Sequence, residues 1–440
     1  MDTNRFIPLQ KIKISSLKLM NLIGYTLLFL SLVYAYDSYI VPEWGYMGFT
    51  FHEDYWRFVQ SLVITLILGL LVPAVLKNPS DILINIQFIF PILPMLVIYA
   101  RSNQSLEYIS FVIFLFLLII TLNKLKIDFL KIPKIKITKF SYQIIAISSC
   151  ALVILTIVLI AFLTNLQFVN FNLLRVYEFR SQISTAIPGY FSYFYSISSK
   201  ILIPTLIILC FHNKQYKILP FVFVLSILMF GLTSHKAVLF YPCISIFIYF
   251  FVRWKYPIQK IILSSILTIL ISLFMFHNEI NNLIPSLLVR RVYFVPASLN
   301  YMYYDFFSKN PKTLFADSKI TLGLIEYPYD VKGAKIVGSL IYPGSTANAN
   351  TGWVGSGYMN LGYIGMFLYS IIISLLFKLL NNISNRIDSL SLTLSLVIVP
   401  FFTLFQSSDL LTTLLSHGLI FSFIIIMIIP SKRRNNEKPK

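Results

Sequence analysis

Charged side chains are scarce in this sequence, where Asp, Glu, Lys and Arg make up 12% of the 440 residues. Soluble domains carry about 25%. Hydrophobic residues make up 57% of the chain, so water could not solvate the surface of a fold built from it. We therefore predict an all-α integral membrane protein, with residues 1–440 forming a single membrane domain.

Cysteine is also rare. Only Cys150, Cys210 and Cys243 occur, each within an apolar run, which gives no support to a disulfide framework or a thiolate metal site. The sequence contains no HExxH, GxSxG, P-loop or dinucleotide-binding motif. We expect neither a cofactor nor a metal ion.

Long apolar runs are abundant. A helix that crosses a bilayer needs roughly 20 apolar residues, and twelve segments of the chain come close to that length. We predict a polytopic bundle of about twelve transmembrane helices. The segments lie near residues 19–36, 58–76, 82–100, 107–122, 143–163, 187–211, 217–231, 237–252, 258–276, 355–377, 389–405 and 411–429.

Acidic residues are few, with 17 Asp and Glu against 36 Lys and Arg. If the N-terminus is cytoplasmic and the loops alternate, the inner segments hold 23 of the basic residues and only 5 of the acidic ones. The positive-inside rule then explains nearly all of the net charge of +19, and both termini are predicted to be cytoplasmic. The basic run at residues 124–139 is expected to rest on anionic lipid headgroups. Nucleic acid is not expected as a partner, because the basic residues are dispersed among short loops.

Ionisable residues are nearly absent from the predicted spans, since only Lys200 lies clearly within one. Transporters usually place several such residues in the membrane, so this argues against transport and directs attention to the outer loops at 37–57, 164–186 and 277–353. In the last, a large extracytoplasmic loop, apolar residues recur at near-helical spacing. They predict one or two interfacial amphipathic helices that could fold over the bundle as a lid.

Two outer segments contain arginine pairs. Arg175 and Arg180 flank Glu178, and two guanidinium groups could grip a pyrophosphate. An ordinary ion pair between Arg175 and Glu178 is the alternative. The adjacent Arg290 and Arg291 run against the charge rule for an outer loop, and anchoring to anionic lipid is their alternative.

Other polar residues are candidates for catalysis or sugar contact. His277, Asp305 and Glu178 could act as a general base, although a histidine at a helix end is more often a cap or surface residue. The pair Glu53-Asp54 is a weaker carboxylate candidate, and a solvated loop pair is the favoured alternative. Residues that could contact sugar or phosphate are His235 and Lys236 in a short turn, Tyr303, and Tyr342, Asn350 and Trp353 where the long loop re-enters the membrane.

The sequence resembles the oligosaccharide repeat-unit polymerases, the Wzy-type O-antigen and capsule polymerases. The resemblance covers most of the chain as architecture, and it implies a GT-C-like helical fold and a metal-independent glycosyltransferase. It rests on Arg175-Val-Tyr-Glu-Phe-Arg180, on Ser234-His-Lys236, on Arg290-Arg291-Val-Tyr-Phe with Tyr304-Asp305-Phe-Phe, and on Asn350-Thr-Gly-Trp-Val-Gly-Ser-Gly357.

The resemblance also implies a reaction and its place. Such enzymes act at the outer face of the bacterial inner membrane, where they move a growing glycan from undecaprenyl pyrophosphate onto the next lipid-linked repeat unit. The product would be a capsule or the O-antigen of lipopolysaccharide, and a chain-length regulator is a possible partner. An O-antigen ligase, or a flippase or exporter of lipid-linked oligosaccharides, is the alternative function.

Overall fold

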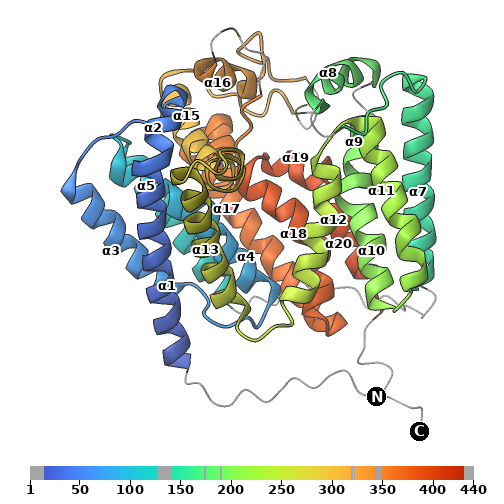
Figure 1. The fold of residues 1–440 in the computed structure, drawn as a ribbon, viewed down its shortest axis with the longest axis horizontal. Coiled ribbons are helices and arrows are strands. Elements are labelled where there is room, and N and C mark those ends of the chain that lie inside the picture. Colours follow the sequence, from blue (N-terminus) through green and yellow to red (C-terminus); the bar gives the residue numbers. More distant parts are fainter. Residues whose placement is uncertain are drawn as a thin grey trace. The chain divides into compact units, whose positions relative to one another are not determined.

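The structure is a computed structural model that describes residues 14–125, 141–172, 175–188, 191–318, 321, 323–342, 344 and 348–430. Every regular element within these ranges is a helix, and they contain no strand (Figure 1). The all-α prediction is thus confirmed for this part of the chain. Most of the basic run at 124–139 lies outside the described residues.

The chain is a multi-pass membrane protein. Within the described ranges, nine helical segments are long and apolar enough to cross a membrane, and three further apolar helices have 10–17 residues. The shorter three are α3 (Tyr55–Leu71), α12 (Ala237–Phe251) and α18 (Leu390–Gln406). A helix therefore occurs at each of the twelve predicted segments. The long segments are Ile14–Met47, Pro79–Arg101, Leu106–Lys124, Tyr142–Thr164, Tyr193–His212, Tyr216–Thr233, Pro257–His277, Trp353–Ile387 and Leu410–Ile428.

Contacts within the chain divide it into two compact units, which are described separately. Unit 1 holds residues 1–125, 256–374 and 405–407, and unit 2 holds residues 126–255, 375–404 and 408–440. The single membrane domain over 1–440 stays a prediction. Besides α3, unit 1 contains α1 (Ile14–Ala35), α2 (Val41–Trp44), α4 (Pro79–Gln87), α5 (Leu93–Arg101), α6 (Leu106–Lys124), α13 (Pro257–His277), α15 (Val295–Lys309), α16 (Gly333–Ile341) and the first part of α17 (Trp353–Ile387).

The centre of unit 1 is the helical segment Pro79–Arg101, of which 94% of the apolar window is buried. A helix that is apolar on all sides must be covered by other elements, and α1, α3 and α15 contact it. One of its polar side chains, Asn85, is paired through both amide atoms. The Tyr25 hydroxyl of α1 donates to Asn85 Oδ1, and Asn85 Nδ2 donates to the Pro73 carbonyl at 3.0 Å.

The long loop predicted at 277–353 is indeed partly helical. A short α14 (Leu283–Pro285), a π-helix (Ser286–Phe294) and α15 follow one another without a break, and α16 comes later. The apolar face of α15 packs inside the protein and not at a membrane interface as expected, because Tyr301 and Tyr303 are 1% and 2% exposed. The Tyr301 hydroxyl donates to the Met95 carbonyl at 2.9 Å. Tyrosines that predicted an interfacial helix are therefore satisfied inside the protein.

The helix α17 is interrupted near its start. Gly362 has φ 62° and ψ −143°, a region that essentially only glycine adopts. The backbone N–H groups of Thr313 and Leu314 donate to the carbonyls of Met359 and Asn360, each at 3.0 Å. The loop after α15 thereby pairs with carbonyl groups that the break releases.

Unit 2 is built around α7 (Ser141–Thr164), α10 (Ile203–His212), α11 (Leu219–Thr233) and α12, which contact one another and lie side by side in Figure 1. Lys200 lies, as predicted, within a span, in the π-helix Ser198–Leu202 of the segment Tyr193–His212. The unit also contains α8 (Val176–Ala186), α9 (Phe191–Ile197), α19 (Leu410–Leu415), α20 (Leu419–Ile428), the later part of α17 and most of α18.

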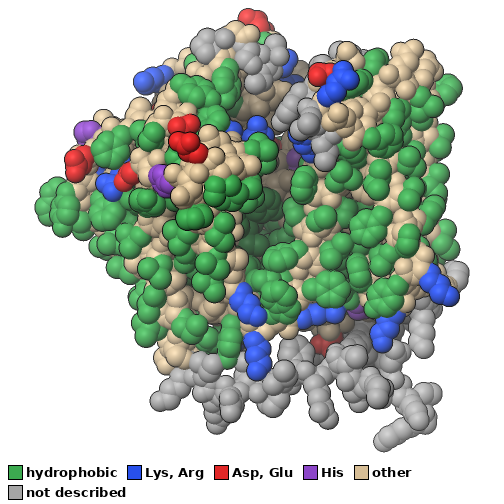
Figure 2. All heavy atoms as spheres, in the orientation of Figure 1, with side chains coloured by type: hydrophobic (Ala, Val, Ile, Leu, Met, Phe, Trp, Pro, Cys, Tyr) green, Lys and Arg blue, Asp and Glu red, His purple; other side chains and the backbone are tan. Residues whose placement is uncertain are grey.

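The surface carries the pattern expected of spans. Figure 2 shows hydrophobic side chains along the sides of the helices, with most Lys, Arg, Asp and Glu towards the helix ends. Large apolar side chains such as Ile147, Phe162 and Leu263 are 69%, 75% and 55% exposed. Such exposure is costly in water and favourable in lipid.

Candidate functional site

Arg290 is the buried arginine of unit 1, with 6% of the residue exposed. It lies on the π-helix between α14 and α15, an irregular turn of a kind that is frequent at functional sites. Its Nε and Nη2 donate to Ser286 Oγ at 3.1 and 2.9 Å, and its Nη1 is 3.3 Å from Met47 Sδ. The guanidinium carbon is 3.7 Å from the centroid of the Trp44 ring. These residues, with Tyr39, form what we call the arginine cage.

No carboxylate pairs with Arg290 among the described residues. Burial lowers the pKa of its guanidinium, and the charge of Arg291 acts in the same direction, whereas Tyr342 and Tyr39 oppose the shift. The Tyr39 hydroxyl and Trp44 Nε1 are buried donors without a hydrogen-bond partner. Burying a cation and unpaired donors costs free energy. A bound anion would pair with the Arg290 guanidinium, the Tyr39 hydroxyl and Trp44 Nε1.

The structure separates the two arginines that the sequence placed together. Arg291 is exposed, in contrast to Arg290. His277 is exposed at the end of α13, where its ring contacts Tyr34 and Phe276 at centroid distances of 6.2 and 5.2 Å. Phe276, and not His277, packs against Tyr39 of the cage, at 4.7 Å. The predicted role of His277 as a base gains no support from this position.

Asp305 lies on α15 beside a group of tyrosines. Its side chain is exposed, yet burial of its surroundings raises the pKa of the carboxyl above its ordinary value, with Lys309 opposing the shift. The Tyr108 ring stacks on Tyr304 at 4.4 Å, and Tyr358 lies 5.0 Å from Tyr304. We call these three residues the tyrosine cluster.

Two charged residues that the sequence did not single out border the tyrosine cluster. Lys312 Nζ is 4.6 Å from the Tyr358 ring centroid, and burial lowers the pKa of its ammonium group. Glu107 is exposed at the start of α6, directly before Tyr108. Tyr108 and Tyr358 are 0% and 5% exposed, whereas Tyr304 is partly exposed, so the cluster packs behind the Tyr304 ring and holds it in place.

A cavity of about 530 Å³ also adjoins α15. It is within the usual range of about 300–1,000 Å³ for small-molecule sites. Tyr329 connects it to the helix, because its ring is 5.9 Å from that of Phe306 and its hydroxyl donates to the Pro311 carbonyl at 2.5 Å. The lining residues are Glu326, Tyr327, Pro328, Tyr329 and Asp330.

The segment that precedes α17 is anchored by Asn300 of α15. Asn300 is 1% exposed, and its Oδ1 accepts from Thr351 Oγ1 at 3.0 Å and from the Gly355 N–H at 2.8 Å. Of the residues predicted for sugar contact, Trp353 is fully buried and Asn350 is exposed. Asn350 is therefore open to a ligand, whereas Trp353 is not.

Two other predicted residues have defined contacts. Tyr303 is 2% exposed and donates to the Ala349 carbonyl at 3.0 Å, which gives it a structural role. Tyr342 places its hydroxyl 3.3 Å from Met47 Sδ, at the edge of the arginine cage. Tyr342 thus joins Arg290 as predicted site residues that lie together.

We expect Asn300→Leu to lower the stability of unit 1. The substitution leaves the Gly355 N–H and the Thr351 hydroxyl without an acceptor, at a cost of about 1–3 kcal/mol for each buried group. Thermal unfolding in detergent should show a lower transition temperature. Asn350→Leu is the matched control, and an equal loss in both variants would contradict this role for Asn300.

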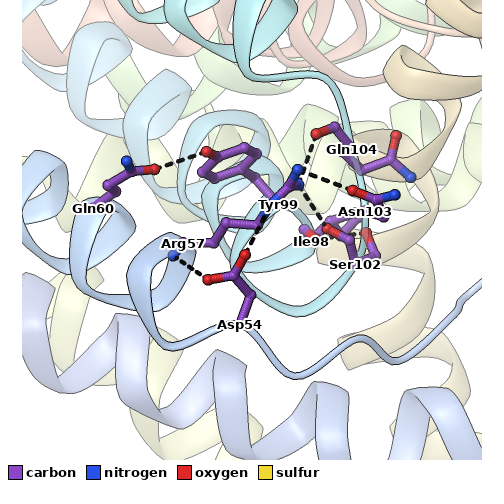
Figure 3. A network of polar contacts seen from close by, with 8 residues as sticks. All are labelled: Asp54, Arg57, Gln60, Ile98, Tyr99, Ser102, Asn103 and Gln104. Carbon is purple, nitrogen blue, oxygen red and sulfur yellow. Dashed lines mark hydrogen bonds and ion pairs between the residues drawn. The ribbon is translucent and has the colours of Figure 1, made fainter.

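Asp54 proves to be a structural residue, as Figure 3 shows. Its carboxylate caps α3 by accepting from the Arg57 N–H at 3.1 Å and pairs with Arg57 Nε at 3.4 Å. Arg57 then donates to the carbonyls of Ser102 and Gln104 at 3.2 and 2.8 Å, and to Asn103 Oδ1 at 2.9 Å.

This network fixes the turn before α6. The next residue, Ser105, caps α6 by accepting from the Tyr108 N–H at 3.2 Å, and its hydroxyl is 3.3 Å from the Tyr304 hydroxyl. The network therefore supports the tyrosine cluster. For Asp54, a structural role fits better than that of a base.

The remaining predicted residues belong to unit 2. Arg175 pairs with Glu178 at 2.8 Å, and both side chains are 59% exposed, so the alternative of an ordinary ion pair describes what is seen. The hydrogen bond and the charge of Glu178 raise the pKa of Arg175. The His235 ring lies 5.3 Å from that of Tyr195, and Lys236 precedes α12. The side chain of Arg180 lies outside the described residues.

Residues 76–400 match a family model described as "Putative O-antigen polymerase". The matched range holds Ser286 and Arg290 of the cage, Asp305 and the tyrosine cluster. Searches among curated proteins and among solved structures gave no match. Because the family model covers well over half of the 440 residues, the chain belongs to the O-antigen polymerase family.

Proposed function

We propose that this protein polymerises a surface polysaccharide by moving a growing glycan from a polyprenyl diphosphate onto the next lipid-linked oligosaccharide. The observation that carries the proposal is the arginine cage, in which a buried guanidinium has no carboxylate partner among the described residues. A leaving lipid diphosphate carries the charge that such a site would bind. Arginine suits this role because its planar fork pairs with two phosphate oxygens.

The proposed reaction is a single glycosyl transfer. A hydroxyl oxygen of the acceptor sugar attacks the anomeric carbon of the donor glycan, and the bond from that carbon to the phosphate oxygen breaks. The electron pair leaves with the diphosphate, where Arg290 stabilises the developing charge. The unused donors of Tyr39 and Trp44 are placed to add hydrogen bonds. This assignment makes the enzyme metal-independent, and chelation with EDTA should leave its activity intact.

The proton of the acceptor hydroxyl needs a base, for which we assign Asp305. A raised carboxyl pKa makes the carboxylate a stronger base than that of an ordinary aspartate. Tyr304 and the cavity at Glu326–Asp330 adjoin the same helix, and we assign acceptor-sugar binding to this side of unit 1.

The finer points of topology belong to the same proposal. Twelve crossings in a GT-C-like arrangement, with both termini cytoplasmic, would place the arginine cage at the outer face of the bacterial inner membrane. There it could meet undecaprenyl diphosphate carriers and a chain-length regulator. Arg175, Arg180, His235 and Lys236 of unit 2 stay candidates for binding a second lipid-linked substrate.

Deletion of the gene followed by separation of surface glycans on a gel tests the function. We expect the ladder of polymer lengths to collapse to single repeat units, and the plasmid-borne gene to restore it. Loss of all surface glycan, with polymer accumulating on the lipid carrier, would indicate a ligase instead. Absence of any lipid-linked unit at the outer face would indicate a flippase.

A further inference from the structure

An apolar groove runs between α1 and α13 in unit 1, with a volume of about 420 Å³. Its sides include Ile23 and Leu27 of α1 and Leu263 and Ile266 of α13. Ile23, Leu27 and Leu263 are 52%, 50% and 55% exposed. Both helices belong to segments that can cross a membrane, so this groove faces hydrocarbon, and a flexible chain of methylene groups fits its chemistry.

Glycine sets the floor of the groove. A Cβ atom added at Gly24 would come 2.9 Å from Ile262 Cγ2, closer than carbon atoms normally approach. Because Gly24 has no side chain, α1 and α13 pack closely at this position. The larger apolar side chains on either side form the walls of the groove. The groove is therefore a product of the packing of these two helices.

The groove has one polar end, formed by Tyr256, Gln259 and Lys260. Gln259 is held in place, because its amide nitrogen Nε2 donates to Asn21 Oδ1 at 2.7 Å and to the Ala74 carbonyl at 3.0 Å. Lys260 is exposed. A lysine at the mouth of an apolar groove complements a ligand with an anionic head and an apolar tail.

The direction of the helices adds to this complementarity. Both α1 and α13 begin near the polar end, at Ile14 and Pro257, and the N-terminus of a helix favours a negative charge. The arginine cage lies at the other end, because Trp44 follows α1 and Arg290 follows α13. The 21 residues of α13 span about 31 Å at 1.5 Å per residue, so the groove mouth and the cage face opposite leaflets.

We propose that this groove binds one anionic phospholipid of the leaflet opposite the arginine cage. One acyl chain lies against Gly24 between the two helices, and the phosphate lies by Lys260. A lipid diphosphate substrate is not the assigned occupant, since its head would have to reach the cage at the far end. The site is separate from the proposed glycosyl transfer and does not depend on it.

Lipid retention tests the proposal. The purified full-length protein in mild detergent is incubated with equal amounts of dioleoyl phosphatidylglycerol and dioleoyl phosphatidylcholine, and bound lipid is counted by native mass spectrometry. We expect roughly one phosphatidylglycerol per chain to survive activation that strips the other lipids. Leu263→Trp, which fills the groove, should reduce this retention at least several-fold.

Charge and position are tested by further variants. Lys260→Gln should weaken the preference for phosphatidylglycerol over phosphatidylcholine. Leu270→Trp, at an exposed site on the same helix outside the groove lining, should retain lipid as the wild type does. Each variant must elute as the wild type does on size exclusion, and Ile23→Trp replaces Leu263→Trp if that variant does not.

Three results would overturn the proposal. The first is unchanged retention when the groove is filled. The second is preferential retention of undecaprenyl phosphate added as a competitor, which would make the groove a carrier site. The third is a change of oligomeric state in both Leu263→Trp and Ile23→Trp, which would make the groove an interface between copies of the chain.

Discussion

Arg290→Met is expected to abolish polymer formation while leaving the unfolding temperature unchanged or higher. The activity should fall by about 10³–10⁵, the range measured when an arginine that stabilises a charged transition state is removed. Stability should not fall with it. Replacing a buried charge that lacks a partner by an apolar side chain of similar length is often neutral or stabilising, and Arg290 has no carboxylate partner among the described residues.

The comparison variant is Arg386→Met in unit 2. Arg386 donates from Nη2 to the carbonyls of Ile426 and Met427 at 3.0 and 2.7 Å, so its removal takes these hydrogen bonds from the end of α20 and should lower the unfolding temperature. Arg290→Lys keeps the charge but loses the fork, and we expect partial activity. If Arg290→Met unfolds earlier, in parallel with Arg386→Met, Arg290 has a structural role and the assigned diphosphate site is wrong.

Asp305→Asn should lower the rate of polymerisation by about 10²–10⁴, the usual contribution of a general base. Retention of the lipid diphosphate donor should be unchanged, because the cage is intact. The measurement is chain growth on reconstituted protein together with donor binding to the same preparation. Glu279→Gln, an equally conservative change at an exposed carboxylate of unit 1, should leave both unchanged.

The pH dependence follows from the direction of the Asp305 shift. The folded protein raises the pKa of this carboxyl, and the base works only when it is deprotonated. The rate should therefore fall as the pH is lowered through the raised pKa, at a higher pH than an ordinary aspartate would give. A wild-type profile without this acid limb, or an Asp305→Asn variant that keeps it, would contradict the assignment.

The membrane architecture was predictable because the apolar composition of each segment by itself predicts a spanning helix. Each of the twelve apolar segments became a helix, since a long apolar run has few other ways to satisfy its backbone in lipid. The loop at 277–353 was predicted as helical for the same local reason. Its burial was not predictable, because the tyrosines of α15 count as partly polar in a sequence, whereas Tyr301 is satisfied by the Met95 carbonyl.

The candidate site was predictable only in part. Arg290 and Asp305 attract attention by residue type, and so does Tyr342. Trp44 and Met47 contact Arg290 across more than 240 positions of sequence, and no periodicity within either segment reveals such a contact. Ser286 left a weaker signal, because it stands one helical turn before Arg290. Glu107 and Lys312 could not be predicted as neighbours of the tyrosine cluster, because the cluster forms only when α6, α15 and α17 pack together.

The break in α17 has a consequence for how the protein fits its bilayer. An unbroken helix from Trp353 to Ile387 has 35 residues and would be about 52 Å long, against a hydrocarbon core of about 30 Å. Such a mismatch would have to be relieved by strong tilt or by local thickening of the membrane. The turn at Gly362 shortens the straight part of the helix to about 37 Å. This one glycine therefore reduces the mismatch between the length of α17 and the thickness of the hydrocarbon core.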